Sequence, residues 1–374
     1  MRILLTGGGT AGHINPAIAI ADIIKKREPS AEVAFVGTPD GMEGRLVKEA
    51  GYPMYTVRVQ GFRRSLSPQN VRAAWLAVTS PRAAKKILEE FRPSLVIGTG
   101  GYVSWPLLRA AAKAGIPTAL HESNAIPGLT TRKLAPYMDA LWLNFKETAR
   151  ELPARCVSPI QTGNPLRQGF STVSREAARA ELGLREKDFL ILSFGGSRGA
   201  ELLNDAVLRF MQEEIPRHPR LYHVHATGER HFEACRQRLG GASVGRARIL
   251  PYISKMEIYL SAADIVVCRA GAMTLSELAL CGKCTILVPS PHVAKDHQRK
   301  NAAVFASCRA ARIIEENDLP GDKLRNCIFE LKNSPKTRIF MQNAIKKFAF
   351  PHANEVIYRQ IQLLAKKTSA DGNC

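Results

Sequence analysis

Four glycine-containing turns, each after a short apolar segment, are the residues whose types and spacing most clearly predict chemistry. They lie at residues 7–12, 98–101, 195–199 and 269–272. Glycine lets backbone N–H groups approach an anion closely, and a following helix adds a dipole that favours negative charge. At the carboxyl ends of strands, such turns line the crevice where α/β proteins bind ligands. The pattern indicates phosphate-binding turns, with tight turns that hold no ligand as the alternative.

The first turn matches the G-x-G-x-x-G dinucleotide fingerprint at residues 7–12. That fingerprint also requires an acidic residue about 20 positions further along the chain. The second predicted strand instead ends with Val-Gly-Thr at residues 36–38, without a carboxylate. No Gly-Lys-Ser/Thr follows the glycines, which argues against a Walker P-loop. We therefore expect neither a dehydrogenase nor a P-loop enzyme.

His13 directly follows the first turn, at the start of a predicted helix. The helix dipole disfavours imidazolium at this position, so the ring is expected to be neutral. A neutral ring can accept the proton of a hydroxyl group and act as a general base. A histidine that only caps the helix or packs in the core is the alternative.

A candidate nucleotide site lies in the second half of the chain, at residues 268–277, which combine a strand end, a turn and a helix start. Thr274 and Glu277 have the spacing of a capping box. The carboxylate of Glu277 could equally bind the two vicinal hydroxyls of a ribose, and the two roles are compatible. The residues expected to contact a diphosphate are Ser197, Arg167 and Arg269.

The elements that must position these residues are strands and helices in strict alternation. Apolar segments predict strands at 3–6, 33–36, 95–98, 118–122 and 140–143, and again at 190–194, 222–226, 265–268 and 285–288. This alternation is typical of doubly wound α/β domains, each with a parallel sheet. We expect one domain at residues 1–163, a second at 164–345, a C-terminal helix at 346–367 and a disordered tail at 368–374.

The composition limits the classes of partner that we expect the chain to bind. Lys and Arg outnumber Asp and Glu by 53 to 33 in 374 residues, a net charge of +20. This balance favours nucleic acid, an anionic membrane or a phosphorylated substrate. Aromatic residues make up 7%, mostly at core-like positions, so the stacking platforms of nucleic-acid binding are lacking. We expect no bound nucleic acid.

Neither a leader nor a metal site is indicated. The first residues predict a strand rather than a signal peptide, and no apolar run approaches the ~20 residues of a membrane span. We expect a cytosolic chain with at most peripheral membrane contact. Cys281 and Cys284 form the only C-x-x-C and have no second pair, so we expect them to pack as small apolar groups. No D-x-D pair stands at a strand end, and we expect no metal and no cofactor.

Residues 62–86 mix apolar and basic side chains. Such a mixture suits an interfacial patch on anionic lipid. An ordinary amphipathic helix that buries Trp75 and Val78 in the core is the alternative. The residues of the predicted patch are Trp75, Leu76, Val78, Arg72 and Arg82.

Beyond these patterns, the sequence closely resembles the MurG family of bacterial glycosyltransferases, which add N-acetylglucosamine (GlcNAc) to lipid I and give lipid II for peptidoglycan. The matching stretches, in order, are GGGTAGHINPA at 7–17, GTGGYVS at 98–104, HESNAIPGLTTR at 121–132, TGNPLR at 162–167, GGSRGA at 195–200, CRAGAMTLSE at 268–277 and DHQRKNA at 296–302. The resemblance implies a GT-B fold, two Rossmann-like domains facing a cleft. The N-terminal half would hold lipid I and the C-terminal half UDP-GlcNAc.

The resemblance also implies roles for individual residues. His13 is the first candidate for the general base and Glu122 the second. The residues that would contact UDP-GlcNAc are Thr10, Ala11, Gly12, Asn124, Arg167, Ser197, Ile253, Ala272, Met273, Thr274, Leu275, Ser276, Glu277 and Gln298. The chain departs from the family where it has Trp105 in place of Gly and Arg198 in place of Gln.

The implied setting is the cytoplasmic face of the bacterial inner membrane, where the enzyme would bind peripherally to anionic lipids. Cell-wall and division proteins are further expected partners. A UDP-GlcNAc epimerase, or another GT-B glycosyltransferase that acts on a lipid, is the alternative function. An epimerase would need neither a lipid acceptor nor a membrane patch.

Overall fold

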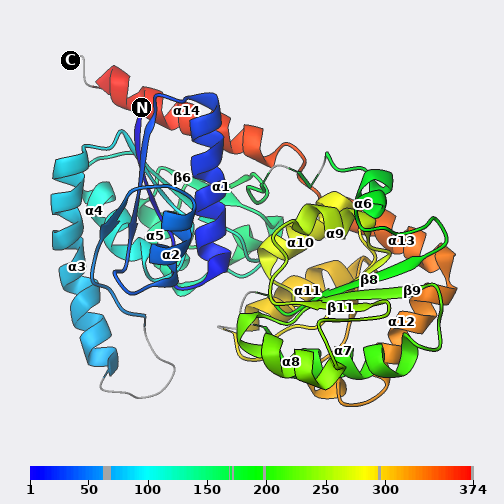
Figure 1. Ribbon diagram of the computed structural model, residues 1–374. Coiled ribbons are helices and arrows are strands. Elements are labelled where there is room, and N and C mark those ends of the chain that lie inside the picture. The colour runs from blue at the N-terminus through cyan, green and yellow to red at the C-terminus, as the bar shows by residue number, and fades with distance from the viewer. Residues whose placement is uncertain (62–68, 168, 171, 197–198, 294–295, 372–374) are drawn as a thin grey trace. The chain divides into compact units, whose positions relative to one another are not determined.

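The computed structural model describes residues 1–61, 69–167, 169–170, 172–196, 199–293 and 296–371 (Figure 1). The chain forms two compact units. The first contains Met1–Leu166 and Phe350–Cys374, and the second contains Arg167–Ala349. The chain therefore crosses into the second unit a few residues after the boundary expected at 163, and returns to the first unit for its last helix.

A seven-stranded sheet forms the centre of the first unit, in the order β3-β2-β1-β4-β5-β6-β7 with all pairs parallel. Its strands are β1 Arg2–Thr6, β2 Glu32–Gly37, β3 Met54–Thr56, β4 Leu95–Gly98, β5 Thr118–Glu122, β6 Ala140–Leu143 and β7 Ile160–Gln161. The order reverses between β1 and β4, so the loops after these two strands lie side by side at the ligand-binding edge of such sheets.

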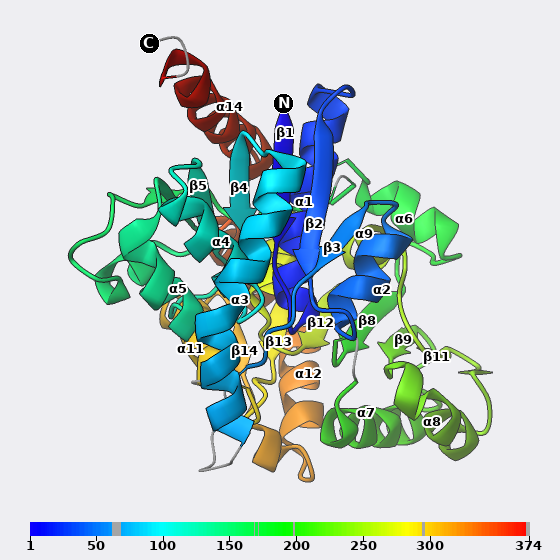
Figure 2. The same cartoon turned by 90° about the vertical axis from the view of Figure 1, so that its left-hand side faces the viewer.

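Helices cover both faces of this sheet, because alternate residues of each strand point to opposite sides. Ile3 and Leu5 of β1 pack with α1 (Ala11–Arg27), α2 (Met42–Glu49) and α14 (Ala353–Asp371). Leu4, between them, packs on the other side with α3 (Gln69–Phe91) and α4 (Ser104–Lys113), which lie side by side in Figure 2.

Short helices complete the first unit. They are α5 Leu129–Leu134, η1 Ala135–Tyr137 and η2 Lys146–Glu151. The C-terminal helix differs from its expected bounds of 346–367. Residues up to Lys346 belong to a helix of the second unit, and α14 continues to Asp371. Residues 372–374 of the expected tail lie outside the described residues.

The second unit repeats the architecture with the strand order β10-β11-β9-β8-β12-β13-β14. All pairs are parallel except β10 with β11. The strands are β8 Phe189–Phe194, β9 Leu221–Ala226, β10 Ser243–Val244, β11 Ala247–Leu250, β12 Ile265–Cys268, β13 Thr285–Leu287 and β14 Arg312–Ile313. Here the order reverses between β8 and β12, so this sheet has its own switch point.

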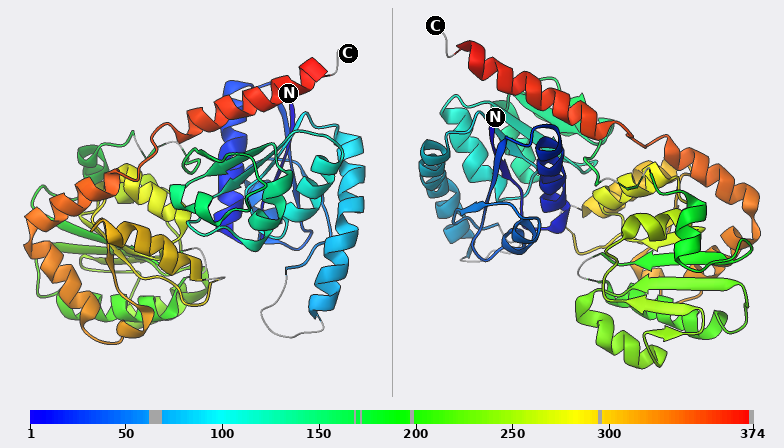
Figure 3. Two further views of the ribbon diagram at one scale, coloured as in Figure 1. Left: turned by 180° about the vertical axis from the view of Figure 1, so that it is seen from behind. Right: turned by 45° about the horizontal axis from the view of Figure 1, so that its top comes forward.

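Helices again lie on both sides of the sheet (Figure 3). One face packs against α7, α8 and α12 through apolar residues such as Ile191 and Val267. Within the described residues, the helices of this unit are α6 Arg175–Glu181, α7 Glu201–Glu214, η3 Glu229–His231, α8 Phe232–Leu239, α9 Met256–Ala262, α10 Ala272–Cys281, α11 His297–Ser307, η5 Glu316–Asp318, α12 Lys323–Asn333 and α13 Pro335–Lys346. Among the residues described, no helix is both long and apolar enough to span a bilayer.

Candidate functional site

Two glycine turns pack directly on each other at the switch point of the first sheet. A Cβ atom on Gly7 would lie 2.1 Å from Oγ1 of Thr99, and one on Gly101 would lie 2.1 Å from the carbonyl oxygen of Gly8. Larger residues would force the turns apart. These glycines therefore serve close packing between the turns after β1 and β4, rather than two separate phosphate sites.

The imidazole of His13 packs against the turn that follows β4. The Nδ1 atom of His13 lies 3.1 Å from the carbonyl oxygen of Thr99, and Thr99 Oγ1 donates a 2.6 Å hydrogen bond to the carbonyl of His13. A Cβ on Gly100, whose φ is +98°, would come within 2.9 Å of Nδ1. Since a carbonyl only accepts, Nδ1 carries the ring hydrogen and Nε2 keeps the lone pair of a base.

Glu43 is a buried carboxylate behind the first turn, which the sequence analysis did not identify. Its Oε2 accepts a 3.3 Å hydrogen bond from the backbone N–H of Gly9, and Oε1 accepts from the N–H and hydroxyl of Thr38. The side chain is 1% exposed. Burial of Tyr102, whose ring lies against Gly9, raises the pKa of its hydroxyl, and the charge of Glu43 adds to the increase. The first turn therefore already holds an anion on its inner side.

Glu122, at the end of β5, organises the loop that follows it. One oxygen accepts from the backbone and side-chain N–H groups of Asn124, both at 3.0 Å. The other accepts from the N–H of Gly128 at 3.1 Å and the hydroxyl of Thr131 at 2.6 Å. Both oxygens of this 2% exposed carboxylate are engaged, so the contacts favour a positioning role over proton transfer.

The other residues expected near the sugar lie at the start of α1. Thr10 is the N-cap residue and makes no capping hydrogen bond through its side chain. Thr10 and Gly12 are exposed, and Ala11 is half-buried. The first turn of α1 contains no acidic residue, so no carboxylate of the helix itself offsets the positive end of its dipole.

In the second unit, the turn after β8 leads into α7. Gly199 has a φ of +74°, and a Cβ there would lie 2.3 Å from the carbonyl oxygen of Thr227. Gly199 therefore packs directly against Thr227, the residue that follows β9. Ser197 and Arg198, expected near a diphosphate, lie outside the described residues.

Helix α10 begins one turn earlier than a capping box would require. Gly271 is the N-cap residue and Ala272 the first helical residue, so Thr274 lies inside the helix and the predicted capping box is wrong. Ala272 and Leu275 are buried, and can offer a ligand only their backbone, whereas Met273, Thr274 and Ser276 are half-buried. Glu277 is consequently free of any capping function.

Glu277 carries an unusual carboxyl group. Burial raises its pKa to about 7, the charge of Glu257 adds to the increase, and the guanidinium of Arg167 opposes it. No residue within the described ranges donates a hydrogen bond to this carboxylate. An acceptor with unused lone pairs beside an exposed arginine suits a diol next to a phosphate group.

Arg269 does not supply charge to a ligand, contrary to expectation. Its guanidinium forms an ion pair with Glu316 and donates to the carbonyl oxygens of Val288 and Pro289 at 3.1 and 3.3 Å. The side chain is 11% exposed. Arg269 therefore ties the end of β12 to the segment after β13.

Ile253 and Gln298 complete the predicted residues of the second unit. Ile253 is 2% exposed, so only its backbone could contact a base. Gln298 lies in the first turn of α11, and its Oε1 accepts a 2.9 Å hydrogen bond from the N–H of Ser290. This bond orients the amide and leaves its Nε2 group as the donor for a ligand.

The predicted membrane patch lies on α3. Trp75 is 64% exposed and Val78 is 74% exposed, so the alternative in which both pack in the core is wrong. Val71, at 75%, extends the exposed surface. Leu76 is half-buried and Arg82 is exposed. Arg72 belongs to the same helix, but its side chain lies outside the described part of the structure.

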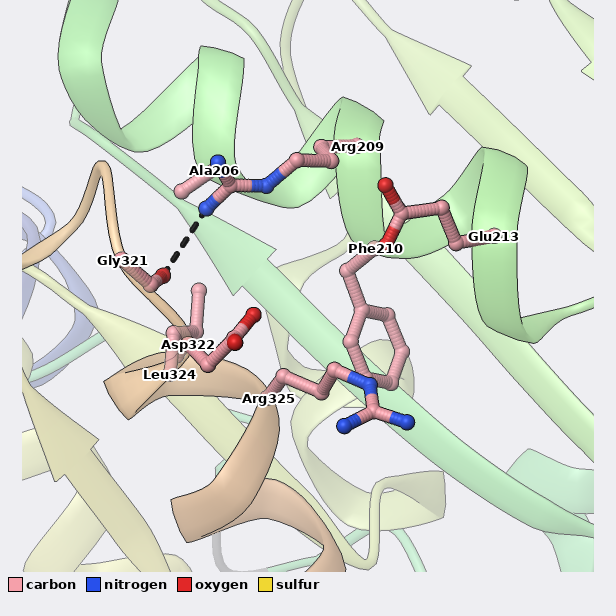
Figure 4. A pocket seen from close by; sticks show the side chains of 8 residues that line it. All are labelled: Ala206, Arg209, Phe210, Glu213, Gly321, Asp322, Leu324 and Arg325. Carbon is pink, nitrogen blue, oxygen red and sulfur yellow. Dashed lines mark hydrogen bonds between the residues drawn. The ribbon is translucent and has the colours of Figure 1, made fainter.

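The two cysteines of the C-x-x-C motif pack in the second unit without a chemical role. Burial raises the pKa of Cys281 and Cys284 to about 12, which keeps both thiols protonated and unreactive. A small cavity between α7 and α12 measures about 10 Å³, enough for a single water molecule. In Figure 4, Arg209 reaches across it to the carbonyl oxygen of Gly321, at 2.9 Å. The cavity cannot hold a substrate.

The comparisons with known proteins agree with this architecture. Residues 3–142 match the glycosyltransferase family 28 N-terminal domain, and residues 190–357 match the glycosyltransferase family 28 C-terminal domain. The chain belongs to glycosyltransferase family 28. The fold class expected from the sequence, two doubly wound α/β domains of the GT-B type, is confirmed.

Two full-length relatives of this family 28 chain carry the name UDP-N-acetylglucosamine--N-acetylmuramyl-(pentapeptide) pyrophosphoryl-undecaprenol N-acetylglucosamine transferase. The relative from Acetivibrio thermocellus is 41% identical over 99% of this chain and 100% of its own length. That from Desulforudis audaxviator is 40% identical over 98% of this chain and 99% of its own.

Solved structures are similar too. The crystal structure of Acinetobacter baumannii MurG is 29% identical, with a TM-score of 0.76 over 96% of this chain and 99% of that one. A UDP-GlcNAc 2-epimerase from Neisseria meningitidis, bound to UDP-GlcNAc, has a TM-score of 0.65 over 97% of this family 28 chain and 100% of its own. At 13% identity, the epimerase shares the fold alone.

Proposed function

We propose that this chain transfers N-acetylglucosamine from UDP-GlcNAc to the 4-hydroxyl of undecaprenyl-pyrophosphoryl-MurNAc-pentapeptide, lipid I, and so forms lipid II. The observation that carries the proposal is the 41% identity to a transferase of that name over 99% of this chain. The two switch-point sites supply the chemistry that such a transfer needs.

The donor nucleotide binds in the second unit. Glu277 accepts hydrogen bonds from the ribose hydroxyls, and Arg167, which interacts electrostatically with Glu277, pairs with the diphosphate. Ser197 and the backbone N–H groups of Ala272, Met273 and Thr274 at the start of α10 add donors to the phosphates. Leu275, whose N–H donates to the carbonyl of Gly271, and Ser276 follow in the same stretch. The backbone at Ile253 contacts the uracil, and Gln298 donates its Nε2 to the hydroxyls of the transferred sugar.

The reaction is a single displacement with inversion. Nε2 of His13 takes the proton of the acceptor hydroxyl as its oxygen attacks the anomeric carbon. The bond to the diphosphate breaks, and UDP leaves with the electron pair. The growing negative charge is stabilised by N–H dipoles and by Arg167. Thr10, Ala11, Gly12 and Asn124 contact the sugar or its diphosphate from the first unit, and Glu122 holds Asn124 in place.

The acceptor carries a polyprenyl tail, so the first unit must reach a membrane surface. The exposed Trp75 and Val78 on α3, with Arg82 and the adjacent Arg72 and Leu76, form the proposed contact with anionic lipids. Amphipathic residues of this kind insert at the headgroup level while basic residues pair with lipid phosphates. The enzyme thus acts peripherally on the cytoplasmic face of the inner membrane.

The test is an incubation of the purified chain with UDP-GlcNAc labelled in the sugar and with lipid I. We expect label in the lipid fraction only when lipid I is present. Conversion of the labelled UDP-GlcNAc to another nucleotide sugar without lipid I would instead indicate an epimerase. Label in neither product would contradict the proposal.

A further inference from the structure

A chain of hydrogen-bonded, buried polar side chains links β8, β9 and α7 of the second unit. Ser193 Oγ on β8 lies 2.7 Å from His223 Nε2 and 2.8 Å from His225 Nδ1, both on β9. His225 Nε2 lies 3.0 Å from Oδ1 of Asn204 on α7. These four residues are at most 2% exposed. Nothing in the proposed reaction uses them.

The contacts allow one arrangement of hydrogens. Asn204 Nδ2 donates a 3.0 Å hydrogen bond to the carbonyl of Thr227, so Oδ1 faces His225 and Nε2 of that ring must carry the hydrogen. Nδ1 of His225 then accepts from the hydroxyl of Ser193. Ser193 Oγ in turn accepts from Nε2–H of His223, whose unpaired buried Nδ1 ends the chain. Both rings are neutral, because burial lowers their pKa values, that of His225 to about 4.

The hydroxyl of Ser193 stabilises the tautomer of His225 that Asn204 requires, because it donates to Nδ1 of that ring. Nδ1 of His225 also lies 3.2 Å from the carbonyl oxygen of Ser193. Without the hydroxyl donor, a hydrogen on Nδ1 could pair with that carbonyl instead. Nε2 would then be an acceptor facing Oδ1 of Asn204, an unfavourable pair of acceptors that rotation of the amide would relieve. The rotated amide could no longer donate to the carbonyl of Thr227.

The same carbonyl supports the glycine turn. A Cβ on Gly199 would lie 2.3 Å from the oxygen of Thr227, so Gly199 packs directly against this carbonyl. Asn204 is the fourth residue of α7, the helix that follows the turn. We infer that Ser193 and His225 are positioning residues that fix the Asn204 amide, the Thr227 carbonyl and hence the position of Gly199, at the end of the turn proposed to bind the donor diphosphate. This inference rests on the proposed function, in which that turn binds UDP.

The test combines UDP binding with the tautomer of His225. In the wild-type protein, ¹⁵N NMR of the histidine rings is expected to show His225 with hydrogen on Nε2. In Ser193→Ala, hydrogen moves to Nδ1, and the Kd for UDP by calorimetry rises roughly tenfold. The KM for UDP-GlcNAc rises similarly while kcat changes little. Ser193→Thr, which keeps the hydroxyl, restores both the tautomer and UDP affinity.

A matched control removes another buried hydroxyl of the same unit. Thr285, at the start of β13, donates to the carbonyl of Lys283 at 3.0 Å, and Thr285→Ala should lower Tm without changing the Kd for UDP. If Ser193→Ala does not fold, Ser193→Cys, with a weaker donor, replaces it and should shift both readouts in the same direction. Hydrogen on Nδ1 in the wild type, or unchanged UDP affinity in the variant, would overturn the inference. Failure of the wild type to bind UDP would instead reject the proposed function.

Discussion

The carboxylate of Glu43 accepts a hydrogen bond from the backbone N–H of Gly9, with 3.3 Å between Oε2 and N. This bond makes the two main glycine turns of the chain unequal. The turn at residues 7–12 has an anion on its inner side, which opposes a phosphate there. In the second unit, Gly199 packs instead against a neutral carbonyl, that of Thr227. The difference supports a donor diphosphate in the second unit and a neutral reacting sugar at the first.

The variant Glu43→Gln tests this arrangement. An amide has one acceptor oxygen, so its NH₂ group would face a backbone N–H of Gly9 or Thr38. We expect a loss of about 1–3 kcal/mol in the free energy of unfolding, together with slower transfer. The Kd for UDP should not change. Glu49→Gln, an exposed carboxylate on the same helix, is the control and should alter stability by less than about 0.5 kcal/mol. Weaker UDP binding in Glu43→Gln would contradict the assignment.

His13→Ala tests the general base. Removal of a positioned base reduces turnover by about 10²–10⁴-fold, and we expect a loss of that size in kcat with both substrates saturating. UDP affinity should stay unchanged, because the nucleotide is assigned to the second unit. Near-normal turnover would show that another group removes the proton.

Glu277 predicts how UDP binding depends on pH. Its raised pKa of about 7 means that the carboxylate is largely protonated below pH 7 and ionised above it. If the ionised form binds the ribose, UDP affinity should fall as the pH decreases from 8 to 6. Calorimetry with uridine, which lacks phosphates that titrate, isolates this effect. A flat profile for the wild type, or the same slope in Glu277→Gln, would exclude Glu277 as the titrating group.

The same pKa predicts an effect on stability. A carboxyl group whose pKa is higher in the folded state binds more protons when folded, so its contribution to stability falls as the pH rises from about 4.5 to 7. Glu277→Gln removes this cost. We expect about 1–2 kcal/mol of added stability at pH 8, less than the full shift would give because the side chain is half-buried. Urea unfolding at pH 8 and pH 5 measures it, and equal effects at both pH values would argue against the shift.

The α3 surface predicts binding to anionic vesicles. Trp75→Ser with Val78→Ser removes two exposed apolar side chains, and we expect most of the protein to stay in the aqueous fraction during flotation with phosphatidylglycerol vesicles. The control is Ile339→Ser with Phe340→Ser, which removes comparably exposed apolar residues from α13 of the second unit. Equal flotation of both double variants would place the membrane contact elsewhere.

Local patterns were sufficient to predict the fold class, because buried parallel strands and amphipathic helices alternate clearly in both halves. The same patterns located His13 at a helix start, although not the carbonyl of Thr99 that fixes its tautomer. Contacts between segments far apart in the sequence could not be predicted from such patterns. Glu43, on α2, accepts a hydrogen bond from Gly9, which lies in the turn before α1. Arg269 pairs with Glu316, 47 residues further along the chain. The only sequence signal for Glu43 was a carboxylate in the first turn of the helix that follows the second strand.

The structure of the lipid product tests the central claim most directly. After incubation with UDP-GlcNAc and lipid I, the product is purified and the linkage of its new sugar is determined by NMR. We predict N-acetylglucosamine joined through a β bond to the 4-oxygen of the muramyl sugar, because a single displacement at the anomeric carbon inverts the α linkage of UDP-GlcNAc. An α linkage, a bond to another hydroxyl or the absence of a disaccharide would contradict the account.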